Sequence, residues 1–344
     1  MYKLYADRIR FLLVFIGLAM PLSAQDMPSP IISGDPDFID PGAVLELLVD
    51  GSLLGTSLPG DVKVGCDGLV YFSDVTFSNR PESYNEQGVR RAGAIWRYDP
   101  ETAGISVFRA PSGMANGLAF DAECQLLAAE GADLGGRRVT RTNLEAGTAE
   151  IVAGLFEDNP FNAPNDLVID ALGHIYFTDT RYVGHEPIRQ DGNAVYRIDV
   201  NGDIERLISE LPRPNGIAVS PDQSVLYVSN LGGALNDSLW AYRLDEHGSV
   251  SSPRLVVDFG EESGADGFVV DAEGNLWVSV LNHTRPGIYA YTPDGVEKAY
   301  IEARSPYNTA FGRGAQSHLL YFTAGRHLYR IAVNKPGYHL PRME

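Results

Sequence analysis

Cysteine and basic side chains are scarce in this 344-residue sequence, which has two cysteines and three tryptophans. Lysine and arginine number 27 against 45 aspartates and glutamates, so the formal net charge is -18 at pH 7. Proteins that bind nucleic acid need clustered basic residues to neutralise phosphates. The charge therefore argues against nucleic acid as a partner. The acidic residues are spread along the chain, which is typical of a solvated surface.

Motifs for nucleophilic catalysis and for histidine-based metal binding are also missing. The sequence has no G-x-S-x-G motif, and its seven histidines show no metal-ligand spacing. The two cysteines, Cys66 and Cys124, are too few to act as a disulfide scaffold for so large a domain. They could form one disulfide in an oxidising compartment or remain as two buried thiols, and the sequence does not choose between these.

Long apolar runs are absent except near the start of the chain. Three basic residues precede the apolar run 11–20, and the small residue Ala24 follows it. This order is typical of a secretory signal, and the run is too short for a stable membrane anchor. We therefore expect residues 1–24 to be a signal peptide and the protein to be periplasmic or secreted. An uncleaved anchor is the alternative.

What the sequence does contain indicates an all-β protein with many tight turns. Glycine (36), proline (21) and tyrosine (17) are plentiful, and no long stretch has a helical apolar period. A phrase made of a small polar start, a short apolar strand, a turn and a second apolar strand occurs six times. The copies are PGDVKVGCDGLVYFSD, ANGLAFDAECQLLAAE, PNDLVIDALGHIYFTD, PNGIAVSPDQSVLYVSN, ADGFVVDAEGNLWVSV and YNTAFGRGAQSHLLYFTA.

The spacing of the six phrases predicts a six-bladed β-propeller with four strands per blade. Their second residues lie at positions 60, 116, 165, 215, 266 and 308, and most phrases are followed by another alternating strand pair. The last phrase is followed by only one strand, 327–333, and an unpaired strand, 44–49, precedes the first. Pairing these two strands would close the ring and remove an open edge. We expect a leader at 25–40, the propeller at 41–335 and a tail at 336–344.

The residues that open the six phrases should meet at one end of the central channel. They are Gly60, Asn116, Asn165, Asn215, Asp266 and Asn308. Asparagine and aspartate are common in turns before strands, but five side-chain oxygens at equivalent positions around a ring favour a cation site. Amide and carboxylate oxygens are hard donors. We therefore expect one divalent cation, with Ca²⁺ as the first choice and Mg²⁺, Mn²⁺ and Zn²⁺ as alternatives.

These phrases resemble the senescence marker protein/gluconolactonase/luciferin-regenerating enzyme family of six-bladed propellers. The resemblance spans about residues 55 to 333 and is closest in the third, fourth and fifth phrases and in GRRVTRTNLEAG after the second. Members of this family bind one divalent cation, and many hydrolyse sugar lactones. The resemblance implies that Asn215 and Asp266 are metal ligands, that Asp266 is also the general base, and that Asn165 lies at the metal and contacts substrate.

The first phrase departs from the family, because Gly60 stands where a glutamate ligand is usual. Asp61, Asp74 and Glu130 are the candidate substitutes. Asp61 would need a bulge to turn inward, whereas Asp74 and Glu130 end second strands that return to the same face. We also expect that Gly60→Glu would raise metal affinity by restoring the missing ligand.

Loop residues near the predicted site are open to two interpretations. Arg181 and His185 follow the third phrase and could bind a hydroxylated or anionic substrate, or be ordinary loop residues. The insertion 77–91 could be a lid or a surface loop. Asn116 and Asn165 are expected to hold substrate oxygens.

The sequence thus predicts a metal-dependent hydrolase of a sugar lactone or a similar cyclic ester. A bound cation would polarise the ester carbonyl. Asp266, or a water that it holds, would supply the hydroxide equivalent. The alternatives are a non-catalytic exported propeller that binds metal or a ligand, and an aryl-ester or phosphotriester hydrolase on the same fold. A small-molecule lactone is the expected partner, with no protein partner inferred.

Overall fold

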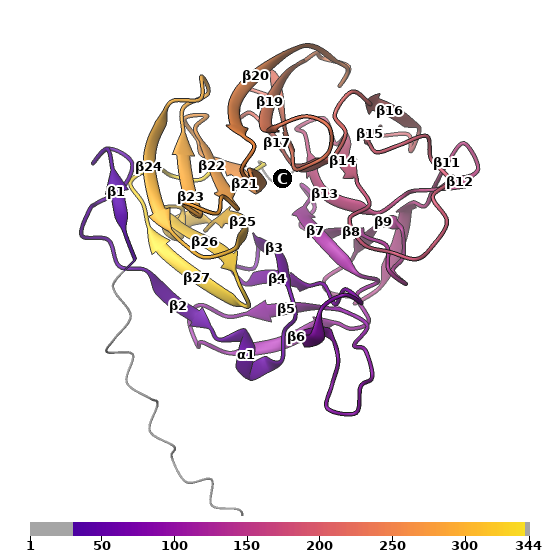
Figure 1. Ribbon diagram of the computed structural model, residues 1–344, viewed down its shortest axis with the longest axis horizontal. Coiled ribbons are helices and arrows are strands. Elements are labelled where there is room, and N and C mark those ends of the chain that lie inside the picture. The colour runs from indigo at the N-terminus through magenta and orange to yellow at the C-terminus, as the bar shows by residue number, and fades with distance from the viewer. Residues whose placement is uncertain (1–29, 341–344) are drawn as a thin grey trace, which may run out of the picture.

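Six antiparallel sheets, five of four strands and one extended to five, surround one central channel in the computed structural model, which describes residues 30–340 (Figure 1). The predicted signal peptide lies outside the described residues. Each repeated phrase forms the first two strands of one sheet, so the six-bladed β-propeller is confirmed. Blades 1 to 3 consist of β3 (Pro59–Val64), β4 (Val70–Asp74), β5 (Ala94–Tyr98) and β6 (Ile105–Arg109); β7 (Ala115–Phe120), β8 (Leu126–Glu130), β9 (Arg138–Thr142) and β10 (Ala149–Ala153); and β13 (Pro164–Ile169), β14 (Ile175–Asp179), β15 (Ala194–Ile198) and β16 (Ile204–Ile208).

The remaining three blades follow the same order, except that the last is completed from the start of the chain. They consist of β17 (Pro214–Val219), β18 (Val225–Asn230), β19 (Asp237–Leu244) and β20 (Val250–Gly260); β21 (Ala265–Val270), β22 (Leu276–Val280), β23 (Gly287–Tyr291) and β24 (Glu297–Glu302); and β25 (Pro306–Phe311), β26 (Leu319–Ala324), β27 (His327–Ala332) and β2 (Glu46–Val49). Short elements outside this pattern are β1 (Ile32–Gly34), β11 (Leu155–Phe156), β12 (Asn159–Pro160), α1 (Gly51–Leu54) and the 3-10 turns Pro81–Ser83 and Gly314–Gln316. No helix among residues 30–340 is long and apolar enough to span a bilayer.

The ring closes by pairing the two ends of the chain, as the sequence predicts. Strand β2 pairs antiparallel with β27, and Glu46 lies opposite Arg330. The Arg330 guanidinium donates to Glu46 Oε2 at 2.6 Å. This pairing leaves β27 with a neighbour on both sides, so blade 6 has no open edge there.

The segment expected to be a leader is partly packed against the propeller. Strand β1 pairs with β24 as a fifth strand of blade 5. Phe38 and Ile39 follow it and are buried in the core cluster between blades 5 and 6. Residues 30–40 are therefore part of the folded domain rather than a free leader.

Residues 336–340, the described part of the C-terminal tail, lie across the far end of the channel, at the centre of the ring in Figure 1. Gly337 forms a bridge with Asp271 of blade 5, and the Tyr338 hydroxyl accepts a hydrogen bond from Gln223 of blade 4. Residues 338–340 line a cavity of about 120 Å³ together with the last residues of all six first strands. The tail therefore covers the end opposite the start of the phrases.

The core consists of apolar clusters between neighbouring blades. Adjacent residues of β14 show why, since Tyr176 packs toward blade 4 and Phe177 packs in the cluster between blades 2 and 3. Successive side chains of a strand point to opposite faces, and both faces of each blade are covered by a neighbour. This explains the nearly continuous apolar character of the second strands.

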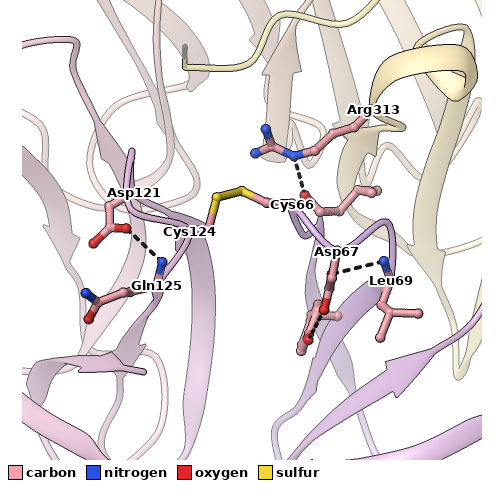
Figure 2. Close-up of a disulfide and its surroundings, with 9 residues drawn as sticks. Cys66, Asp67, Leu69, Asp121, Cys124, Gln125 and Arg313 are labelled. Atoms are coloured by element: carbon pink, nitrogen blue, oxygen red, sulfur yellow. Dashed lines mark hydrogen bonds between the residues drawn. A yellow bond between two sulfur atoms is a disulfide. The ribbon is translucent and has the colours of Figure 1, made fainter. Parts of the chain in front are cut away.

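A disulfide joins Cys66 to Cys124 and settles the alternative that the sequence leaves open (Figure 2). Cys66 lies between β3 and β4, and Cys124 between β7 and β8, so the bond links blades 1 and 2. Both cysteines lie beyond the far ends of the first strands.

Removing this disulfide should destabilise the propeller without touching the opposite end of the channel. The bond closes a loop with a sequence separation of 58 residues, for which the chain-entropy estimate is about 4 kcal/mol. We expect the double variant Cys66→Ser/Cys124→Ser to unfold at a lower urea concentration, with unchanged activity at room temperature. An unchanged urea midpoint would contradict a stabilising role.

Candidate active site at the channel mouth

The starts of the six first strands form one cavity of about 230 Å³ at the mouth of the channel. All six phrase-opening positions line this cavity, as the repeat predicts. The lining residues that matter below are Gly60, Asp61, Arg80, Asn116, Asn165, Asp166, Tyr182, Asn215, Asp266, Tyr307 and Asn308.

An irregularity of strand register at the start of every first strand determines which side chains reach the cavity. In blade 1 the register with β4 shifts between Pro59 and Val62, and the other five blades shift at equivalent places. Such a bulge breaks the strict alternation of side chains. In blade 3, the successive residues Asn165 and Asp166 therefore both line the cavity.

The Asn-Gly and Asp-Gly pairs that open the second, fourth and fifth phrases lie inside first strands and do not form turns. A Cβ atom at Gly216 would lie 2.4 Å from the carbonyl oxygen of Asp266 in the next blade. Glycine is required there because neighbouring inner strands approach too closely for a side chain. The preference of asparagine for turns therefore does not explain these positions.

Three asparagine side chains at the mouth have oxygens without a protein partner. The side chains of Asn116 and Asn165 make no hydrogen bond to residues 30–340. The amide nitrogen of Asn215 donates to the Tyr182 hydroxyl at 2.9 Å, which leaves its amide oxygen for the cavity. Asn308 differs, because its oxygen accepts from the Thr309 N–H. The amide oxygens of Asn116, Asn165 and Asn215 are therefore free to contact a molecule bound in the cavity.

The carboxyl group of Asp266 at the mouth is strongly perturbed. Desolvation in the channel, and then the nearby charge of Asp166, raise the pKa of Asp266 to about 8, against a lowering by the hydrogen bond from Asn215. Desolvation and the charge of Asp61 likewise raise the pKa of Asp166 to about 7. These carboxyl groups repel one another in the absence of a cation.

Asp166 was not among the residues selected from the sequence. It follows Asn165 directly, as Asp61 follows Gly60, and this shared offset is the signal that could have identified it. Asp166 lines the cavity because the bulge places two successive residues of its strand there.

Asp61 is the one candidate substitute ligand that lies in the cavity. One of its oxygens accepts from the Lys63 ammonium at 2.5 Å, and the other accepts from the Leu118 N–H of blade 2 at 2.6 Å. Burial raises the pKa of Asp61, against the lowering effect of Lys63. Asp61 thus adds negative charge to the mouth, while both of its oxygens already have partners.

Asp74 and Glu130 do not line the mouth cavity, although both end second strands as predicted. Asp74 accepts from the backbone N–H groups of Ser57 and Leu58, and so holds the chain that leads into its own blade. Glu130 is buried between the guanidinium groups of Arg109 and Arg138. Their oxygens are used within the protein, so neither replaces the missing glutamate.

The space beside Gly60 is filled by its neighbour in blade 2. A Cβ atom at position 60 would lie 2.1 Å from Asn116 Oδ1. Gly60→Glu alone would therefore displace Asn116, which corrects the expectation that this change simply restores a ligand. A glutamate at this position requires the Asn116 side chain to move away.

Arg181 and His185 also lie outside the cavity. Arg181 is buried and donates to the carbonyl oxygens of Asn162 and Glu186, so it fixes its own loop. His185 is 77% exposed. Tyr182, between them, lines the cavity and is the residue of this loop that sequence reasoning did not select.

The insertion 77–91 is a loop at the edge of the mouth that is held by hydrogen bonds. The Ser78 N–H and the Arg90 guanidinium both donate to Asp133 Oδ2, at 2.6 and 2.9 Å. The Thr76 hydroxyl donates to the Arg91 carbonyl at 2.6 Å. These contacts hold the loop at both of its ends, and Arg80, near the first end, lines the cavity.

Buried hydroxyls connect four of the six first strands to the blade before them. In four blades a serine or threonine of the second strand donates to the carbonyl oxygen of the phrase-opening residue in the next blade. These bonds are Ser73 to Asn116 (2.7 Å), Thr178 to Asn215 (2.7 Å), Ser229 to Asp266 (2.9 Å) and Thr323 to Gly60 (2.6 Å). The hydroxyls therefore help to fix Asn116, Asn215 and Asp266 relative to the blades that precede them.

Ser229→Ala should disturb the Asp266 position. Ser229 Oγ accepts from the Gly216 N–H at 2.7 Å while donating to Asp266, so its loss leaves two buried backbone groups unpaired. We expect a loss of about 1–3 kcal/mol in unfolding free energy and weaker Ca²⁺ binding by calorimetry. Ser279→Ala is the matched control, because the Ser279 hydroxyl finds no partner within residues 30–340. Equal effects of the two changes would contradict the positioning role.

The donor set of the mouth fits a divalent cation. No three His, Cys, Asp or Glu side chains within residues 30–340 gather closely enough to hold a metal by themselves. A cation at the mouth would therefore need amide oxygens besides a carboxylate, and the cavity offers both in Asp266, Asn165 and Asn215. Carboxylate and amide oxygens suit Ca²⁺ or Mg²⁺. A cation there would also offset the desolvation and the repulsion by Asp166, which together raise the pKa of Asp266.

Known proteins that are similar to this chain include gluconolactonases. The family model described as SMP-30/Gluconolactonase/LRE-like region matches residues 91–326. The chain is 30% identical to a gluconolactonase of Zymomonas mobilis over 274 residues, which cover 72% of this chain and 74% of that protein.

Two solved structures share the fold. A gluconolactonase from Xanthomonas campestris superimposes with a TM-score of 0.74 at 24% identity, covering 90% of this chain and 96% of the other. Regucalcin from Agrobacterium tumefaciens, described as a calcium-binding protein, gives a TM-score of 0.67 at 18% identity and covers 87% and 96%.

Proposed function

The chain belongs to the SMP-30/gluconolactonase/LRE-like family, and on that premise we propose that it hydrolyses a sugar lactone at the channel mouth. The observation that carries this proposal is the gathering of Asp266, Asn165 and Asn215 in one cavity at the starts of three neighbouring blades. The gluconolactonase relative supports the reaction, and the unpaired amide oxygens support a polar cyclic substrate.

We propose that Asn165, Asn215 and Asp266 hold one divalent cation, with Ca²⁺ as the first candidate. When bound, the cation would supply a Lewis acid for the ester carbonyl. The calcium-binding regucalcin structure supports this choice. Tyr182 contributes by accepting the hydrogen bond that orients the Asn215 amide.

Asp266 is the general base in this proposal. A water molecule attacks the carbonyl carbon and gives its proton to the Asp266 carboxylate. The bond between the carbonyl carbon and the ring oxygen then breaks, and the ring oxygen takes the proton back from Asp266. The products are a carboxylic acid and a hydroxyl on one open chain, and no covalent enzyme intermediate is needed. Asn116, whose side chain is unpaired, is placed to hold substrate hydroxyls.

A panel of aldonolactones tests this function. Hydrolysis releases acid, so a pH indicator reports turnover with and without a chelator. We expect turnover that a chelator abolishes and that added Ca²⁺ restores. Cation binding without turnover of any lactone would favour the alternative of a non-catalytic binding protein.

We also propose that the protein is exported. The order of charged, apolar and small residues in 1–24 supports a cleaved secretory signal. The Cys66–Cys124 disulfide supports an oxidising compartment, because such bonds are rare in the cytosol. Fractionation of cells that express the full chain, with sequencing of the mature amino terminus, tests this; an intact Met1 in the cytosol would refute it.

A further inference from the structure

We infer that Arg80 binds an oxyanion at the end of the substrate farthest from its ester carbonyl, so that the preferred substrate is an acidic sugar lactone. This inference rests on the proposed lactonase function and names the substrate class of the same cavity. The ligand chemistry is a carboxylate or a phosphate on the carbon that lies outside the lactone ring.

Arg80 is the only cationic residue, within the described part of the chain, that lines the mouth cavity. Its guanidinium lies beside the Tyr307 hydroxyl and lowers the pKa of that group, against the larger opposing effect of burial. Two other arginines of the same loop are committed elsewhere, Arg90 to Asp133 and Arg91 to Asp74. Arg80 makes no ion pair with residues 30–340, so its charge is available to a ligand.

The loop holds Arg80 in place before any substrate arrives. The Arg80 N–H donates to the Phe77 carbonyl, and the Arg80 carbonyl accepts from the Ser83 N–H, both at 3.1 Å. The neighbouring Ser78 is tied to Asp133 through its N–H and its hydroxyl. A guanidinium carried on a backbone fixed in this way can hold a carboxylate or phosphate through two parallel hydrogen bonds.

The charges around the cavity explain why an acidic substrate would need this residue. Asp61, Asp166 and Asp266 lie on the inner side of the cavity, and the whole chain has a formal net charge of -18. Such a field repels an anion from the mouth. A single cation at the outer loop gives the anionic end of a substrate one favourable position, and it leaves the uncharged ester end to face Asp266.

The cavity also limits the size of the substrate. Its volume of about 230 Å³ lies below the roughly 300–1,000 Å³ of drug-sized ligand pockets. A single sugar ring with one anionic substituent suits this space better than an oligosaccharide or a large aryl ester.

Two lactones that differ only at the exocyclic end test the inference. D-Glucono-γ-lactone ends in a hydroxymethyl group, and D-glucaro-γ-lactone has a carboxylate at the same carbon. Phosphogluconolactone, with a phosphate there, separates the two sources of the oxyanion. We would measure kcat/KM for each with the parent and with Arg80→Gln and Arg80→Lys. Arg304→Gln is the control, because Arg304 is exposed just before β25 and does not line the cavity.

We expect Arg80→Gln to lower kcat/KM for an anionic lactone by about 10- to 100-fold, the loss typical of a hydrogen bond between charged groups. The neutral lactone should change by less than about threefold, and Arg304→Gln should change neither. Partial recovery in Arg80→Lys would show that charge is part of the effect. Thermal melting checks that each variant is folded.

Three outcomes would overturn the inference. If the parent protein hydrolyses the neutral lactone but neither anionic lactone, the role of Arg80 is refuted while the lactonase function stands. An equal loss for neutral and anionic lactones in Arg80→Gln makes Arg80 a general structural residue. If the parent protein hydrolyses neither class of lactone, the lactonase function is refuted as well. Failure of the Arg80 inference is thus distinguished from failure of the proposed function.

Discussion

Asp266→Asn should reduce lactone turnover by at least about 100-fold, the lower end of what a positioned general base contributes. The change keeps the size of the side chain but removes the carboxylate that the proposed mechanism uses and that the proposed cation needs most. Ca²⁺ affinity should fall in the same variant, measured by calorimetry. Glu246→Gln removes an equal charge from a side chain that is 88% exposed, and it should leave turnover and affinity unchanged.

The stability of the Asp266→Asn variant should separate a functional role from a structural one. The folded-state pKa of about 8 lies above the ordinary value of 3.8. A carboxyl group whose pKa is raised in the folded state stabilises the fold at low pH. That stabilisation is lost as the pH rises from about 4 to about 8. Without cation and above pH 8, the variant should therefore be at least as stable as the parent. A variant that binds Ca²⁺ as tightly as the parent would show that the ligand assignment is wrong.

Removal of residues up to Asp50 should abolish the stable fold. The deletion takes away β1 and β2, leaves β27 as an open edge, and removes the buried side chains of Phe38, Ile39 and Val49. Each such side chain contributes about 1.5–3 kcal/mol, and three of them approach the roughly 5–15 kcal/mol by which whole domains are stable. We expect insoluble protein, or a melting temperature lowered by more than about 10 °C.

The matched control is a chain that begins at residue 30 and keeps both strands. It should melt like the full chain. If the longer deletion melted at the same temperature as this control, the closure of the ring by β2 would contribute nothing measurable to stability.

The amino-acid sequence by itself determined the architecture and most of the mouth. Six phrases at blade-length spacing are enough to predict six blades, because each inner strand must present its opening residue to the same channel. One strand left over at each end of the repeat likewise predicts that β2 and β27 pair. Asn116, Asn165, Asn215 and Asp266 were found in this way, and all four line the cavity.

Only the tertiary structure decided which other side chains join them. Asp74 and Glu130 have the residue type and strand position of ligands, but backbone N–H groups and arginines that arrive from other segments take up their oxygens. Asp166 enters the cavity because a bulge breaks the alternation of its strand. Arg80 lines the cavity because Asp133, from another blade, holds the loop of Arg80 by a hydrogen bond. A repeat specifies where strands begin, whereas the partner of each polar atom depends on contacts between residues far apart in the chain.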